Sequence, residues 1–154
     1  MFRGLRRTDR TMDSSLVETI LRDGDYGVMS CTGDNGYGYG VALNYVYYDD
    51  AIYFHCAYEG HKLDAIKNNE KVSFLVVSRS LVIPDELRTR YESVIAFGKA
   101  SQVEGQEKAD ALYKLGDKYS KGFEAIVDEE IEKLLTNTCV VKIQIEHKEG
   151  KSAE

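Results

Sequence analysis

Residues 53–63, with the sequence YFHCAYEGHKL, pass from a strand-like pattern through a glycine-containing turn into a helix-like pattern. Successive side chains of a strand point to opposite faces of a sheet. The strand predicted over Ala51–Ala57 therefore has two different faces, with Ile52, Phe54 and Cys56 on one and Tyr53, His55 and Ala57 on the other. A short helix is predicted over His61–Asn68. This stretch thus places a strand histidine close to the beginning of a helix.

The beginning of this helix has the features of an anion-binding site. Gly60 allows the backbone to approach a ligand closely, and His61 and Lys62 follow it in the first turn. The first N–H groups of a helix have no partner within it, and the helix dipole favours negative charge there. A lysine at this end is unfavourable unless an anion compensates it. The residues indicate a phosphate site, and they leave open the alternative of a solvated lysine beside a glycine turn.

Outward from this stretch, the chain shows six strand patterns and four helix patterns. The strands are predicted over Tyr26–Cys31, Gly38–Tyr48, Ala51–Ala57, Lys71–Val77, Tyr91–Val103 and Thr138–His147, and the helices over Ser15–Leu21, His61–Asn68, Gln106–Tyr119 and Phe123–Leu135. The segment Ser80–Arg90, which holds the single proline, is predicted to be a loop. Short consecutive strands separated by turns such as Asn35-Gly36 favour a small antiparallel barrel over a parallel doubly wound sheet. One domain is expected, spanning residues 1–154.

Composition limits the classes of partner. The chain has 154 residues and a formal net charge of −6, whereas proteins that bind duplexes normally carry a basic surface, so no nucleic-acid partner is expected. No apolar run is long enough to cross a membrane, and no signal-peptide pattern follows the arginine-rich N-terminus. A cytoplasmic protein without a membrane partner is expected. Cys31, Cys56 and Cys139 have the spacing of neither a disulfide framework nor a metal site, and are expected to be buried.

Three strings of sequence resemble a known family. They are YGVALNYVYYDDAI (residues 39–52), YFHCAYEGHKLDAIKNNEKVSF (residues 53–74) and YESVIAFGKA (residues 91–100). Together they are similar to the nitroimidazole-resistance (Nim-type) proteins among the pyridoxamine 5'-phosphate oxidase-like flavoproteins. The resemblance covers nearly the whole chain, from Arg6 to Lys151. It implies a six-stranded antiparallel split β-barrel of the Greek-key kind with flanking helices, a homodimer, and FMN bound in the groove between the subunits.

The resemblance also assigns site residues. His61 and Lys62 would hold the FMN phosphate after Gly60. His55, Cys56 and Ala57 would line the strand beneath the ribityl chain. Four consecutive residues of the strand predicted over Gly38–Tyr48 would offer backbone groups to the isoalloxazine ring: Val41, Ala42, Leu43 and Asn44. Ser93 would contact the phosphate or the ribityl hydroxyls.

His55 is also the candidate catalytic residue, because a histidine titrates near neutral pH and can deliver a proton. The alternative is a histidine packed in the barrel wall with its ring nitrogens bonded to backbone. A metal site is not expected: His55 and Cys56 point to opposite strand faces, and no fourth ligand has a suitable spacing near His61.

The resemblance implies an FMN-dependent oxidoreductase that reduces a small, planar, electron-poor compound such as a nitroimidazole. A flavin- or haem-binding carrier or sensor without turnover is the alternative, because a fold does not fix a function. A true pyridoxamine-phosphate oxidase is less favoured. The basic residues expected for a second phosphate are not evident in Val140–Lys151.

Overall fold

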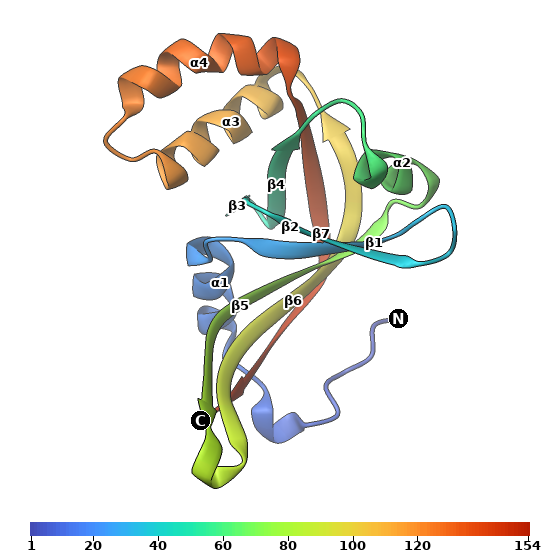
Figure 1. The fold of residues 1–154 in the computed structure, drawn as a ribbon, viewed down its shortest axis with the longest axis vertical. Coiled ribbons are helices and arrows are strands. Elements are labelled where there is room, and N and C mark those ends of the chain that lie inside the picture. The colour runs from blue at the N-terminus through green and yellow to red at the C-terminus, as the bar shows by residue number, and fades with distance from the viewer.

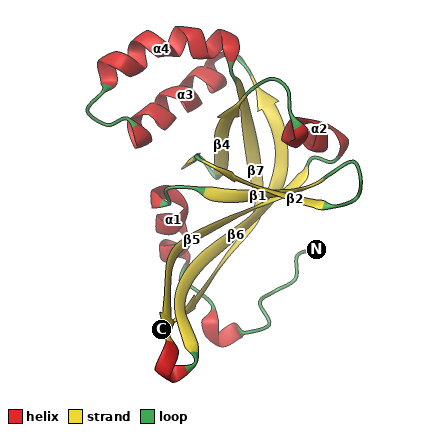
Figure 2. Ribbon diagram, in the orientation of Figure 1, coloured by secondary structure: helices red, strands yellow, loops and turns green.

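The structure is a computed structural model that describes residues 1–154. One antiparallel sheet is surrounded by helices (Figures 1 and 2). Its strands are β1 (Gly27–Thr32), β2 (Gly38–Leu43), β3 (Val46–Tyr48), β4 (Ala51–Cys56), β5 (Lys71–Ile83), β6 (Arg88–Val103) and β7 (Cys139–Ala153). The helices are α1 (Ser14–Asp23), α2 (His61–Asn68), α3 (Gly105–Tyr119) and α4 (Glu124–Asn137), with short 3-10 turns at Thr8–Arg10 and Pro84–Glu86. None of these helices is both long and apolar enough to cross a membrane.

The sheet has seven strands in the order β2-β1-β5-β6-β7-β4-β3, where six were predicted. The single strand expected over Gly38–Tyr48 is interrupted at Asn44-Tyr45. Tyr45 leaves the strand pattern because its side chain is fully buried, with its hydroxyl donating to the Leu21 carbonyl in α1 at 2.6 Å. The two edge strands, β2 and β3, are therefore consecutive in the chain and separated by two residues. The sheet curls toward itself as a split barrel that stays open between them.

The predicted loop over Ser80–Arg90 was wrong. β5 and β6 continue through it as a hairpin, with Leu81 opposite Arg90 and Ile83 opposite Arg88. Pro84 begins the short turn, where its missing N–H costs nothing. The side chains of this hairpin are mostly exposed on both faces, so the sequence lacks the alternation that normally marks a strand. The hairpin projects from the barrel in Figure 1, with the end of β7 beside β6.

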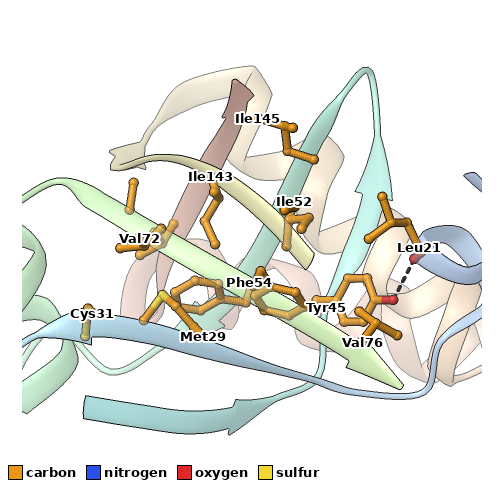
Figure 3. Packing of buried hydrophobic residues seen from close by; sticks show 14 of the residues in the cluster. Leu21, Met29, Cys31, Tyr45, Ile52, Phe54, Val72, Val76, Ile143 and Ile145 are labelled. Atoms are coloured by element: carbon orange, nitrogen blue, oxygen red, sulfur yellow. Dashed lines mark hydrogen bonds between the residues drawn. The ribbon is translucent and has the colours of Figure 1, made fainter. Parts of the chain in front are cut away.

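Two apolar clusters hold the layers together. The first fills the barrel, where Phe54 and Tyr45 are fully buried (Figure 3). Phe74 is also fully buried, and its ring meets that of Tyr45 edge to face, with 4.9 Å between the ring centroids. The second lies outside the barrel, where Tyr53 of β4 and Val140 of β7 are buried under α3 and α4. β4 therefore has one face in the barrel and the other beneath the helix pair, and the predicted division of its side chains is confirmed.

Candidate functional site

A groove of about 430 Å³ lies between β4 and the helix pair α3–α4. Two of the predicted site residues, Asn44 and His55, enter it from the sheet side. The helices contribute mainly apolar side chains: Leu112, Leu115, Phe123, Ile126, Val127, Ile131 and Leu134. Tyr119, Ser120 and Glu130 are the polar side chains that they add. Such a groove, apolar with few polar groups, is typical of sites for small organic ligands.

His55 is exposed at this groove, and its imidazole makes no hydrogen bond within the chain. Neighbouring groups partly exclude water from the imidazole of His55. This desolvation lowers the pKa of His55 below the usual value of a histidine. The imidazole is therefore mainly neutral at pH 7. A neutral imidazole without a partner can accept a proton, donate a hydrogen bond or coordinate an iron atom.

The backbone of the turn between β4 and α2 has the conformation that was predicted from its glycine. Gly60 has a φ of 145°, in a region that favours glycine, and α2 begins at the next residue. Lys62 is half-buried and makes neither an ion pair nor a hydrogen bond within the chain. His61, by contrast, stacks on Tyr39 with 4.0 Å between the ring centroids. Of the two residues assigned to an anion, Lys62 is the one whose charge is free.

A buried lysine holds this turn in place. Lys108 of α3 is only 2% exposed, and its ammonium donates to the Tyr58 hydroxyl at 2.8 Å and to the Leu135 carbonyl at 2.7 Å. Glu104 lies 3.8 Å from the same ammonium. Tyr58 belongs to the turn, so Lys108 ties the turn to both α3 and α4. Our reading of the sequence missed this residue. The available signal was a lysine at position 108 of a helix whose positions 111, 112 and 115 are buried and apolar.

The strand segment predicted beside the isoalloxazine ring lies at the edge of the sheet. β2 pairs only with β1, so the backbone groups on its other side have no strand partner. Val41 and Leu43 point their side chains toward the barrel core, and Ala42 and Asn44 are exposed. Asn44 donates its side-chain N–H to the Asp25 carbonyl at 3.1 Å. From Val41 and Leu43, only backbone groups are therefore offered to a ligand.

Ser93 is not brought near the turn within one chain. It lies on β6, ten residues before Val103, which pairs with Val140 beside Cys139 at the end of the barrel that holds the turn. Ten residues of a strand span about 33 Å, so Ser93 lies about that far along β6 from Val103. Its side chain points to the outer face of the sheet, because the neighbouring Val94 is fully buried inside.

The remaining predicted site residues surround the end of β4. Ala57 is exposed in the turn, and Cys56 is half-buried against the barrel core. Cys31 and Cys139 are buried, as expected for small hydrophobes. Because Cys56 points into the barrel and His55 points away from it, their side chains do not converge on one point.

The sequence profile of the family described as pyridoxamine 5'-phosphate oxidase matches residues 13–152. No match was found among curated protein sequences.

Several solved structures share the fold. A proposed 5-nitroimidazole antibiotic resistance protein from Bacteroides thetaiotaomicron is 24% identical with a TM-score of 0.76, covering 92% of this chain and 85% of the other. The flavocytochrome Anf3 from Azotobacter vinelandii is 19% identical with a TM-score of 0.78, covering 98% and 72%. An FAD- and haem-binding protein from Mycobacterium smegmatis is 17% identical with a TM-score of 0.80, covering 94% and 73%.

The sequence profile spans most of the chain, and these structures share its fold over 92%, 98% and 94% of its length. The chain therefore belongs to the pyridoxamine 5'-phosphate oxidase family.

Proposed function

We propose that this protein binds FMN and uses it to reduce a small, planar, electron-poor compound such as a nitroimidazole. The observation that carries the proposal is the unpartnered, half-buried Lys62 beside Gly60 at the first turn of α2. A lysine left without a carboxylate at the end of a helix that favours anions suits a phosphate. The family and the flavin named for two of the structural relatives support the same class of ligand.

The residues present fit FMN in three respects. Lys62 and the first N–H groups of α2 would hold one terminal phosphate. The free edge of β2 would offer backbone groups to the polar edge of the ring system, in keeping with the edge position of Val41–Asn44. The turn Cys56–Lys62 contains no lysine or arginine other than Lys62. A single charged side chain suits the one phosphate of a mononucleotide better than the two phosphates of a dinucleotide.

FMN, when bound, supplies the transfer of electrons to the substrate. The apolar walls of the groove beside His55 would exclude water from a planar compound. His55 would deliver a proton from its imidazolium form, which exists below its lowered pKa. Phe123 and Ile126, which are 61% and 57% exposed, would offer apolar surface to the substrate.

We further propose a homodimer formed through the outer face of β1, β5 and β6. Val28, Leu75 and Ile95 lie side by side across these three strands and point outward. Leu75 is 39% exposed and Val77, two residues further along β5, is 52% exposed. An uncovered apolar face of this kind is typical of an interface. Ser93 lies opposite Val77 on the same face, so a second subunit would bring it into the interface.

A specific observation also favours a second function, the binding of haem without turnover. The imidazole of His55, which makes no hydrogen bond within the chain, lines an apolar groove, and histidine is a common axial ligand of haem iron. Two structural relatives are named as a flavocytochrome and as an FAD- and haem-binding protein.

Turnover separates the two functions. The protein loaded with FMN and reduced chemically without oxygen is mixed with a nitroimidazole, and the return of the oxidised flavin spectrum is followed. Reoxidation well above the rate of free reduced FMN supports the reductase. Reoxidation no faster than free FMN, together with tight binding of haem, supports the carrier.

A further inference from the structure

Cys56 and Cys139 lie directly opposite each other at the end of the barrel. Cys56 ends β4, Cys139 begins β7, and the two residues are paired in the antiparallel ladder. Opposed residues on antiparallel strands have Cα atoms about 4.5–5.5 Å apart. A disulfide requires roughly 4.4–6.8 Å. Both side chains pack toward the core of the barrel, and both thiols are free.

The position of this pair in the ladder determines how far apart the two residues lie. The Ile145 N–H donates to the Asp50 carbonyl at 3.2 Å, which marks that pair as hydrogen-bonded. Pairs alternate along an antiparallel ladder, so Cys56 and Cys139, an even number of residues further on, belong to the same class. The side chains of such pairs are the more widely spaced. The Cα separation of such a pair, about 5.5 Å, still lies within the range that a disulfide allows.

The two thiols differ in accessibility. Cys56 is half-buried, whereas Cys139 is 2% exposed. Burial, together with the neighbouring Cys139 thiol, raises the pKa of Cys56 to about 11, against the opposing charge of Lys62. The reactive thiolate of Cys56 is consequently scarce at neutral pH, and its oxidation is slow.

We propose that Cys56 and Cys139 are a reversible oxidation site, in which hydrogen peroxide joins them by an intrachain disulfide. The Cys56 thiolate attacks the O–O bond, which breaks to release hydroxide and leaves a sulfenic acid. The Cys139 sulfur then attacks the sulfenic sulfur, the S–S bond forms, and water leaves. Two thiols are oxidised and one peroxide is reduced to two water molecules. A small thiol reverses the reaction by exchange.

This site does not depend on the proposed cofactor, since it follows from the strand register alone. Its place in the fold links it to the turn that holds Lys62. The bond would fasten the last residue of β4, where that turn begins, to the strand that follows α4.

The test uses the full chain without any flavin. The protein is treated with hydrogen peroxide, the remaining thiols are alkylated after unfolding, and the intact mass and peptides are analysed. We expect one alkylated thiol of three, at Cys31, and a peptide pair joined through Cys56 and Cys139 that dithiothreitol separates. Cys31→Ser should keep the bond, whereas Cys139→Ser and Cys56→Ser should each prevent it. Three alkylated thiols, a bond to Cys31, a bond between two chains or a sulfinic acid at Cys56 without a disulfide would overturn the proposal.

Discussion

Two side chains of the candidate site have no partner within the folded chain. Lys62 carries a charge without a carboxylate nearby, and His55 carries an imidazole without a hydrogen bond. A half-buried ammonium without a counter-charge is unfavourable at the beginning of a helix, and an exposed imidazole without a partner is free to bind a ligand. We interpret both as groups kept for a ligand. His61, which the sequence grouped with Lys62, stacks its ring on Tyr39.

Replacing Lys62 by alanine should weaken FMN binding. The loss of a hydrogen bond to a charged group costs about 1.5–3 kcal/mol, which corresponds to a dissociation constant higher by roughly 10- to 150-fold. Lys67→Ala, in the exposed last turn of the same helix, is the matched control and should leave the constant unchanged. Titration of FMN by its fluorescence measures both variants. An unchanged constant in Lys62→Ala would remove this residue from the phosphate site.

Replacing His55 by glutamine should remove proton delivery while keeping a hydrogen-bonding side chain. We expect turnover of a nitroimidazole to fall by roughly 10²–10⁴-fold. The melting temperature and the affinity for FMN should barely change, because the imidazole of His55 makes no hydrogen bond within the chain. Normal turnover together with a lower melting temperature would instead identify a structural histidine.

The pH dependence of the same reaction gives a second test of His55. Desolvation lowers its pKa below the ordinary 6.5, so the proton-donating form is present only at acidic pH. If His55 donates the proton, kcat/KM should rise as the pH falls from 8 toward and through that lowered pKa. In His55→Gln, this rise should be absent. A wild-type profile that is flat below pH 6.5 would contradict the assignment.

Among the strands, the close approach of β6 to β7 depends on Gly98. A bulge lies between Phe97 and Gly98 in the ladder with β7. A Cβ atom placed on Gly98 would lie 2.2 Å from the Gln144 carbonyl oxygen, a rigid backbone atom. Gly98→Ala should therefore lower the free energy of unfolding by about 1–3 kcal/mol, the usual cost of overpacking. Gly38→Ala in β2, where a Cβ meets nothing within 4 Å, is the control. Equal urea midpoints for the two variants would refute this.

The sequence predicted those elements in which local pattern and packing agree. The strand 51–57 alternates because one face fills the barrel and the other lies beneath α3 and α4. The hairpin at 80–90 escaped prediction because its side chains are mostly exposed on both faces and show no strand alternation. The break at Tyr45 escaped because its cause, the Leu21 carbonyl, lies 24 residues away in the sequence. The turn at Gly60 could be predicted because its residues are adjacent in the sequence. The groove could not, because it is formed by β4 together with α3 and α4, which lie far along the chain.

At the scale of the whole molecule, the uncovered face of β1, β5 and β6 predicts a dimer. Val77→Glu places a charge in that face and should convert the dimer to a monomer. Tyr113→Glu, at a position on α3 that is 42% exposed, should leave it intact. Light scattering after size-exclusion chromatography measures the mass. A wild-type monomer at micromolar concentration, with FMN bound, would rule out the dimer.

We propose above all that this chain is a flavoprotein whose phosphate site is the turn ending in Lys62. Its most direct test is an equilibrium titration of the purified protein with FMN, FAD and haem in parallel, each followed by absorption after removal of unbound ligand. We predict that FMN is retained at one per chain with the bands of oxidised flavin, and that FAD binds more weakly. Retention of haem alone, or of none of the three, would contradict the account.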